Sequence, residues 1–271
     1  MDVAGLVFHS PKEQPFSAIV NRASQALQRA SERVHWLNSL RAVPPRAARF
    51  GVPPRRIGAD GSNAGDYLAH DSLGTGDLVR DTSAWFERTT GHRLAIRRYA
   101  LAGEEQYAAV ITPLAAGGLV EVPVVDTGEG MAQVLPVIVL GCLARLGRIG
   151  SEPLLAVEHP ELHLHPAAHA ELAAFFCHLV SAVTKPTIVI ETHSENFLLR
   201  VQIAIATGEI STKDVVVHWI RALEDGRSVV DTITFDEAAR PQGAGWPPGV
   251  FAEDTEQAKA LLRVRKEKGL V

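Results

Sequence analysis

Glycine–lysine pairs are absent from the sequence. None of its six lysines follows a glycine, and residues 1–57 contain only Gly5 and Gly51. This absence excludes a phosphate-binding loop of the Gly-x-x-x-x-Gly-Lys-Ser/Thr type, in which backbone amides and one lysine neutralise most of a nucleotide's charge. The sequence therefore lacks one common means of holding a triphosphate.

Cysteine and long hydrophobic runs are also scarce. Cys142 lies in an apolar run and Cys177 in a predicted helix, a setting that suits neither a disulfide framework nor a thiolate metal site. The longest apolar run, Val134–Ala144, is about half of the roughly 20 residues that a membrane-spanning helix needs. No cationic segment leads into an apolar one at the amino terminus. We therefore expect a cytoplasmic protein without a membrane partner.

The sequence has no strong excess of one charge. Its 27 basic and 31 acidic side chains give a net charge of −4, which argues against a chain that coats nucleic acid along its whole length. Residues 1–58 carry nine basic and three acidic side chains, which leaves 18 and 28 in residues 59–271. Any DNA contact is therefore expected in the basic segment 1–58.

Hydrophobic periodicity predicts an α/β fold. Apolar residues at helical spacing indicate a long amphipathic helix from residue 15, followed by a short strand over 34–40. From residue 126 onward, continuous apolar runs alternate with helical patterns, which is typical of a parallel sheet with helices on both faces. The predicted strands here are 154–157, 187–190 and 215–220, and the predicted helices are 166–183 and 196–207.

Composition also divides the chain into four predicted segments. They are a basic helical and proline-rich segment (1–58), a mixed α+β lobe (59–125), an α/β segment (126–235) and a carboxyl-terminal appendage with a charged helix (236–271). The lobe is predicted to hold a helix over 75–88 and strands over 93–101, 107–112 and 119–125. Near the carboxyl terminus, we expect a strand over 227–235 that forms a hairpin across residues 224–226, and then a helix over 253–268.

Three polar motifs come directly after apolar runs, where open α/β sheets place their ligand sites. Glu158 ends one strand, and an acid in that position is how phosphoryl-transfer ATPases hold magnesium. His193 follows the next strand and can donate a hydrogen bond to a phosphate oxygen; Thr192 or Ser194 there is also a candidate helix N-cap. Gly128 and Gly130 precede an apolar helix whose free N–H groups suit a phosphate.

As a set, these motifs resemble a known family. Asp-x-Gly-x-Gly-x-x-Gln-Val-Leu-Pro (126–136), Glu-x-Pro-Glu-Leu-His-Leu-His-Pro (158–166) and Glu-Thr-His-Ser-Glu (191–195) are similar to the carboxyl-terminal half of ABC-type ATPases of the RecF, OLD and AAA-like group. The likeness extends to a carboxyl-terminal appendage of unknown function. It implies the fold of a P-loop NTPase that lacks the strand, loop and helix of the Walker A unit.

The resemblance also implies roles. Gly128 and Gly130, with Gln133, match the signature loop, which in the family contacts a nucleotide bound by the opposite subunit. Glu158 matches the Walker B carboxylate, which binds Mg²⁺ through water, and His193 matches the switch histidine. His159 occupies the position of the usual catalytic glutamate, where it is either a competent base or a silent replacement.

The missing Walker A motif leaves three interpretations open. The chain supplies signature and switch elements to a homo- or heterodimeric partner that bears Walker A, it is a degenerate regulatory subunit that does not hydrolyse ATP, or it is part of a split or truncated gene. The first implies that ATP and Mg²⁺ are used only together with the partner. The family likeness implies DNA repair or phage defence as the process.

Two other classes of enzyme are weaker interpretations. A metal-dependent hydrolase would use four histidines and two glutamates, namely His159, His163, His165, His169, Glu158 and Glu161. However, Pro160 and Pro166 interrupt any single helix that could present these side chains to one metal ion. Asp126-Thr127-Gly128 matches the triplet of dimeric aspartic proteases, yet these are small all-β chains, whereas this triplet opens onto an apolar helix.

Overall fold

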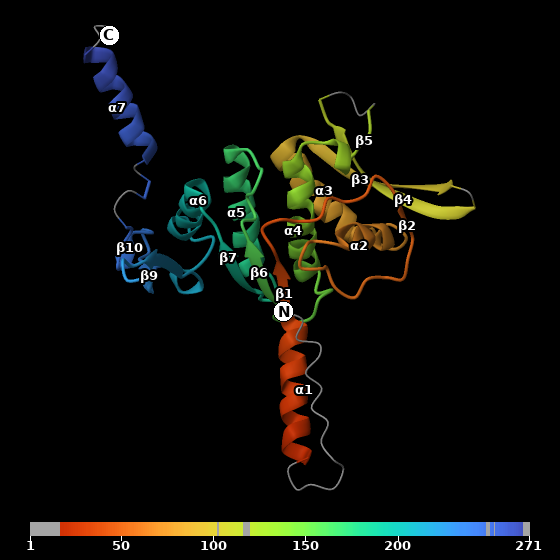
Figure 1. Ribbon diagram of the computed structural model, residues 1–271. Helices are drawn as coiled ribbons and strands as arrows, with labels where there is room; N and C mark the ends of the chain where they lie inside the picture. Colours follow the sequence, from red (N-terminus) through yellow and green to blue (C-terminus); the bar gives the residue numbers. More distant parts are fainter. Residues whose placement is uncertain (1–16, 102, 116–119, 248–249, 252, 268–271) are drawn as a thin grey trace. The chain divides into compact units, whose positions relative to one another are not determined.

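The computed structural model describes residues 17–101, 103–115, 120–247, 250–251 and 253–267 (Figure 1). The chain divides into two compact units, Met1–His193 and Ser194–Val271. Residues 15, 16, 119 and 268, at the ends of predicted elements, lie outside the described residues.

A three-stranded parallel sheet forms the centre of the first unit. Its strands are β1 (Val34–Leu37), β6 (Leu154–Glu158) and β7 (Thr187–Glu191), in the order β1-β6-β7. The helix α5 (Pro166–Val180) connects β6 to β7 and lies against β7. It also contacts α4 (Glu129–Arg145), which is buried along nearly its whole length. The α/β class with a parallel sheet flanked by helices is confirmed.

The two faces of this sheet differ in their coverage. On one face, His35 and Leu37 of β1 lie beside Leu155 and Val157 of β6, and all four are buried. The other face is made by the residues between them, and three of its apolar side chains are largely exposed: Val34 (38%), Trp36 (46%) and Val189 of β7 (55%). Parallel sheets are normally covered on both faces. Here the described residues cover one face well and the other only in part.

A second, antiparallel sheet lies in the same unit. It has the order β2-β4-β3, and β5 pairs with β4. The strands are β2 (Ala48–Arg49), β3 (His92–Leu101), β4 (Glu104–Pro113) and β5 (Val122–Pro123), and α3 (Asp77–Thr90) packs on β3. The predicted strand 119–125 is too long, because Pro123 has no N–H to continue a ladder and the chain turns into η2 (Val124–Asp126).

One helix of this region was not predicted. Residues 59–76 are rich in glycine, serine and aspartate, yet α2 (Ala64–Asp71) forms within them. Leu68 and Ala69 are fully buried, and α2 contacts α4. Tertiary packing thus overrides a weak local helix propensity.

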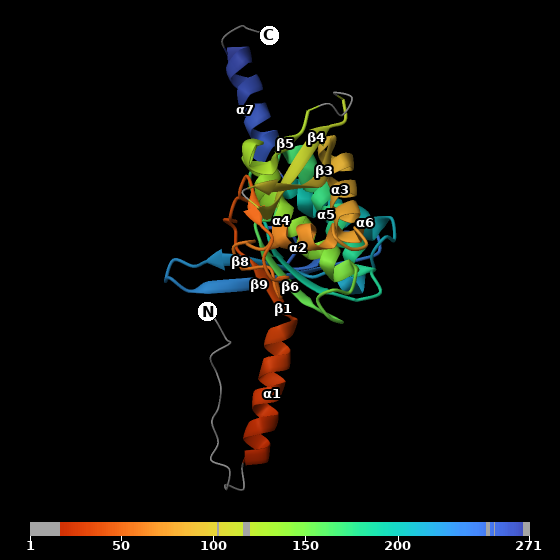
Figure 2. The same cartoon turned by 90° about the vertical axis from the view of Figure 1, so that its right-hand side faces the viewer.

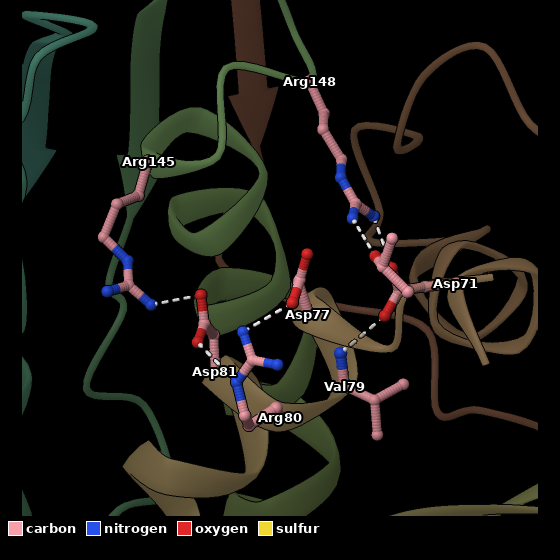
Figure 3. A network of polar contacts seen from close by, with 8 residues as sticks. Asp71, Asp77, Val79, Arg80, Asp81, Arg145 and Arg148 are labelled. Atoms are coloured by element: carbon pink, nitrogen blue, oxygen red, sulfur yellow. Dashed lines mark hydrogen bonds and ion pairs between the residues drawn. The ribbon is translucent and has the colours of Figure 1, made fainter.

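An ionic network joins α2 and α3 to the carboxyl-terminal end of α4 (Figure 3). Asp71 accepts hydrogen bonds from Nη1 of Arg148 at 2.6 Å and from the backbone N–H of Val79 at 2.9 Å. Arg145 pairs with Asp81 at 2.5 Å. The Asp71 side chain is 2% exposed. A buried carboxylate of this kind needs its partner, so the network fixes the lobe helices against α4.

The amino-terminal helix α1 (Ser17–Arg33) leads into β1 without a connecting loop (Figures 1 and 2). Both Nε and Nη2 of Arg33 donate to the carbonyl of Glu152, at 3.0 and 2.8 Å, which fixes this junction. No helix among the described residues is both long and apolar enough to span a bilayer.

The second unit contains a helix followed by an antiparallel sheet. After α6 (Glu195–Ala206) and η3 (Thr212–Asp214) come β8 (Val217–Ala222), β9 (Ser228–Phe235) and β10 (Pro241–Gly243), in the order β10-β9-β8. The predicted hairpin across residues 224–226 is confirmed. The charged terminal helix is α7 (Glu253–Glu267).

Candidate functional site

Glu158 lies at the carboxyl end of β6, as its motif predicts. Its Oε1 accepts a hydrogen bond from Nε1 of Trp36 at 3.2 Å, and its Oε2 accepts one from the backbone N–H of Ser39 at 3.1 Å. β1 and the residues that follow it thus orient this carboxylate. A carboxylate accepts up to about four hydrogen bonds or ligand contacts, so Glu158 retains acceptor capacity.

His159 and His193 are brought together by the parallel pairing of β6 and β7. Glu158 and Glu191 are register partners, so the residues that follow them leave the same edge of the sheet. The two imidazole rings stack with centroids 5.0 Å apart and an angle of 16°. His159 has a positive φ of 40°, its N–H donates to the carbonyl of Glu191 at 2.8 Å, and its Nε2 lies 3.7 Å from Oε1 of Glu191.

Arg41 connects this edge of the sheet to α4. Its Nη2 donates to the carbonyls of Glu158 and His159 at 2.6 and 3.0 Å. Its backbone N–H donates to Oε1 of Gln133 at 2.9 Å, and Nε2 of Gln133 donates back to its carbonyl at 2.7 Å. Burial lowers the pKa of the Arg41 guanidinium to about 10, against the opposing effect of Glu161 and Glu158. Gln133 therefore positions the loop after β1.

Glu161 holds the loop that carries His193. This residue is buried, and its Oε1 accepts hydrogen bonds from Oγ1 of Thr192 at 2.6 Å and from the N–H of His193 at 3.1 Å. Its other oxygen, Oε2, is buried and accepts no hydrogen bond from the described residues. The loops after β6 and β7 are thus one connected structure.

The two glycines at the start of α4 differ in their surroundings. Gly128 is the N-cap residue; its φ of −60° and ψ of 144° suit any residue, and a Cβ there would contact nothing within 4 Å. A Cβ on Gly130 would lie 2.4 Å from the carbonyl oxygen of His163. Within the described part of the chain, no side chain caps this helix terminus. The first turn of α4 therefore packs tightly on the loop after β6 and presents backbone N–H groups.

The donor set at Glu158 fits a magnesium ion. Mg²⁺ prefers oxygen ligands and is usually held by one or two carboxylates with several waters retained. Glu158 offers carboxylate oxygens oriented by two hydrogen bonds, and Glu191 places a second carboxylate on the neighbouring strand. The ring nitrogens of the stacked histidines are hydrogen-bonding groups at the same edge of the sheet.

The alternative sites are not assembled in the described part of the chain. Its His, Cys, Asp and Glu residues form no group of three or more that could hold a metal. His165 instead caps α5, where its Nδ1 accepts from the N–H of Ala167 at 3.2 Å, and Nε2 of His169 lies 3.2 Å from the carbonyl oxygen of Leu164. Asp126 forms an ion pair with Arg46.

The connecting residues of this site carry little signal in the sequence. Arg41 is more than a hundred positions from Glu158, and only their shared sheet edge brings them together. A basic residue directly after a predicted strand, before the Pro44–Pro45 pair, is the one signal that the sequence offered. Glu161 was considered as a metal ligand, whereas it acts in the structure as a hydrogen-bond acceptor within the loops.

Several solved structures are similar to this chain. One comes from work on the ATP-driven dimerization and DNA-stimulated activation of SMC ATPases: it is 10% identical, with a TM-score of 0.43, over 70% of this chain and 96% of that chain. An Smc head domain with an extended coiled coil from Pyrococcus furiosus, bound to the carboxyl-terminal domain of ScpA, is 10% identical, with a TM-score of 0.45, over 80% of this chain and 46% of that one. An Smc head domain from Pyrococcus yayanosii is 11% identical, with a TM-score of 0.42, over 61% and 28%.

A comparison with curated proteins found no match. A family model does match residues 9–200, which is more than half of the 271 residues. Its description is "AAA domain, putative AbiEii toxin, Type IV TA system". The match includes the glycines before α4, the carboxylate at the end of β6 and the histidine after β7, and the chain belongs to this family of AAA domains.

Proposed function

We propose that this AAA domain is a nucleotide-dependent switch subunit of the RecF/OLD-like ABC class. It contributes the signature and switch elements to an ATP site that a Walker A-bearing partner chain completes. It acts in the cytoplasm, in DNA repair or phage defence.

The observation that carries the proposal is the assembly at the carboxyl edge of β6 and β7. Glu158, His159 and His193 follow two neighbouring strands to the same sheet edge, where the two imidazole rings stack. The pairing of Glu161 with the His193 loop holds that arrangement. Ligands of open α/β sheets bind at this edge.

The roles follow from the positions. Glu158 would hold Mg²⁺ through water, and the ion would neutralise charge on the bound phosphates. The imidazole of His193 is exposed and free to donate to a phosphate oxygen, and stacking against His159 limits its rotation. The uncapped start of α4 at Gly128 would offer N–H groups to a phosphate.

The partner would supply the phosphate cradle. The sequence has no Gly-Lys pair, and a cradle lysine with its ring of amides contributes several kcal/mol of electrostatic stabilisation. The domain alone should therefore bind Mg-ATP weakly and turn it over very slowly.

Imidazole resonances in NMR spectra test this proposal on the isolated protein. Titration with Mg-ATP at millimolar concentration should shift the ring protons of His159 and His193 without measurable hydrolysis. Glu158→Gln and His193→Ala should each reduce these shifts, because the first weakens the Mg²⁺ site and the second removes a phosphate donor.

The matched control is His218→Ala, an exposed histidine of β8 in the other unit. It should leave the shifts of His159 and His193 unchanged. Hydrolysis by the isolated domain at an ordinary enzyme rate would refute the need for a partner's cradle. A titration that leaves both imidazoles unaffected would refute the site itself.

A DNA-binding role of residues 1–58 has narrower support. Arg46 is paired with Asp126, Arg49 with Glu104, and Arg56 donates to the carbonyls of Ser31 and Val34. The exposed Arg22 and Arg29 of α1 and the exposed Arg55 are the candidate phosphate contacts among the described residues. Retention of a DNA duplex that weakens steeply with salt, and weakens further in an Arg22→Gln/Arg29→Gln variant, would support this role; salt-independent retention would exclude it.

A further inference from the structure

The helix α6 begins directly after the loop that carries His193. The boundary between the two compact units falls between His193 and Ser194. Before it, the N–H of His193 donates to Oε1 of Glu161. After it, Oγ of Ser194 accepts a hydrogen bond from the N–H of Phe197 at 3.1 Å and caps α6. No loop separates His193 from the helix, so whatever fixes the first turn of α6 also fixes the direction in which the chain leaves His193.

The carboxyl-terminal appendage holds that first turn. Oε1 of Glu195, the first residue of α6, accepts a hydrogen bond from the backbone N–H of Phe251 at 3.2 Å. The ring of Phe251 packs edge-on against Trp246, with centroids 5.2 Å apart, and Trp246 lies against Phe235 at the end of β9, with centroids 6.0 Å apart. We call these three aromatic residues the clasp. Aromatic pairs of this geometry stabilise a fold beyond the area that they bury, so the clasp positions the N–H that reaches Glu195.

A second contact ties the appendage to the middle of α6. Nε2 of Gln202 donates to the carbonyl of Ala239 at 2.8 Å. The turn that presents this carbonyl is held by Asp236, whose carboxylate accepts from the backbone N–H and from Nε of Arg240, at 2.9 and 2.7 Å. The helix α6 and the segment from β9 to the clasp thus form one connected structure. One contact lies at the first residue of α6, and the other lies about two turns further along.

We propose that the carboxyl-terminal appendage controls the position of His193, with Glu195 as the positioning residue through which it acts. An intact clasp holds the first turn of α6, and displacement of the clasp releases Glu195 and lets His193 move. Because coupling between two sites is reciprocal, a phosphate that engages His193 should also change the surroundings of the clasp. This last consequence rests on the proposed function, whereas the link between the clasp and His193 needs no nucleotide.

A simpler role for Glu195 makes a different prediction. A carboxylate in the first turn of a helix stabilises the helix through its dipole, whether or not it accepts a hydrogen bond from elsewhere. That role needs the negative charge. The link to Phe251 needs only an acceptor oxygen, which the amide of glutamine also provides. The variants Glu195→Ala and Glu195→Gln therefore separate the two roles.

Hydrogen exchange at the His193 amide, in the full chain without nucleotide, tests the proposal. Glu195→Ala should quicken this exchange about fivefold, as the loss of one hydrogen bond of ordinary strength does to a local opening equilibrium. Glu195→Gln should stay near the wild-type rate. Trp246→Leu removes the ring that packs on Phe251 and should act in the same direction as Glu195→Ala. Unchanged protection of the amides of β6 shows that the variants are folded.

Gln202→Ala is the matched control, because it removes the other hydrogen bond between α6 and the appendage. It should leave the exchange at His193 unchanged. Equal quickening by Gln202→Ala would overturn the proposal, because any loosening of α6 would then be sufficient. A wild-type rate in Glu195→Ala would also overturn it. So would an effect of Glu195→Gln as large as that of Glu195→Ala, because the charge would then be the cause.

Mg-ATP extends the test to the proposed nucleotide site. In the wild-type protein it should shift the indole N–H resonance of Trp246, which is assigned by its absence in Trp246→Leu, together with the ring protons of His193. Glu195→Ala should remove the shift at Trp246. A wild-type shift at His193 alone would overturn the coupling and leave the proposed function intact. Shifts at neither residue, with exchange still quickened by Glu195→Ala, would refute the proposed function and support the link.

Discussion

The carboxylate of Glu161 accepts a hydrogen bond from the backbone N–H of His193 at 3.1 Å, so the loop after β6 holds the loop after β7 in place. The same Oε1 atom also accepts from Thr192. The orientation of His193 therefore depends on a residue that contacts no candidate ligand directly.

Removing this acceptor should loosen the His193 loop. Glu161→Ala leaves the N–H of His193 and the hydroxyl of Thr192 without this acceptor, at a cost of about 2 kcal/mol in the free energy of unfolding. Glu161→Gln keeps a carbonyl acceptor and should lose less. Hydrogen exchange at the His193 amide should quicken in the Ala variant and not in Glu171→Ala, an exposed control on α5. Unchanged exchange would contradict the role of Glu161.

The close approach of Gly130 to the His163 carbonyl predicts a marked difference between two neighbouring glycines. Gly130→Ala should lower the free energy of unfolding by about 1–3 kcal/mol, because the backbone must shift to admit the methyl group. Gly128→Ala, where the space is open and φ is −60°, should change it little. Urea denaturation of both variants checks this, and equal losses would refute the packing argument.

The ionic network at the end of α4 should contribute to stability through its buried member. Arg148→Met leaves the carboxylate of Asp71 buried without its cation, and we expect a loss of about 2–4 kcal/mol. Arg227→Met breaks an exposed ion pair with Asp225 and should cost well under 1 kcal/mol. Thermal unfolding of the two variants compares them directly. A small loss for Arg148→Met would show that water replaces the pair.

Acid should destabilise the first unit through His35. Burial, assisted by the nearby charge of Arg56, lowers the pKa of this histidine to about 4. The unfolded chain takes up this proton near pH 6.5, so above that pH the protein keeps the whole contribution of His35 to its stability. As the pH falls from 6.5 toward 4, the free energy of unfolding decreases by up to about 3 kcal/mol.

His35→Leu should flatten this part of the pH dependence, because neither state then binds the proton. His218→Gln, at an exposed position of β8, should leave it unchanged. Denaturation curves between pH 4 and pH 7 give the comparison. A slope that persists in His35→Leu would assign the effect to other groups.

The parallel sheet and its motifs were predictable because their signals are local. The apolar runs ending at Glu158 and Glu191 predicted two strands, and parallel strands end at the same edge, which places His159 and His193 near each other. The roles of these residues in nucleotide binding stay predictions.

The features that the sequence did not reveal depend on distant contacts. Arg41 acts through carbonyl groups more than a hundred residues away, and α2 forms because α4 covers it. The partial covering of one face of the parallel sheet was hidden for another reason. Ile188-Val189-Ile190 is apolar on both faces of β7, so its composition is that of a strand covered on both sides, whichever face is exposed in the fold.

The hydrogen bond between the indole N–H of Trp36 and Oε1 of Glu158 gives the protein an intrinsic optical probe. A magnesium ion held by this carboxylate, as we propose, would alter the electrostatic field at the indole, so the emission spectrum of Trp36 would report its binding. Titrations can then be followed on unlabelled protein, with Trp36→Phe as the blank for the other three tryptophans.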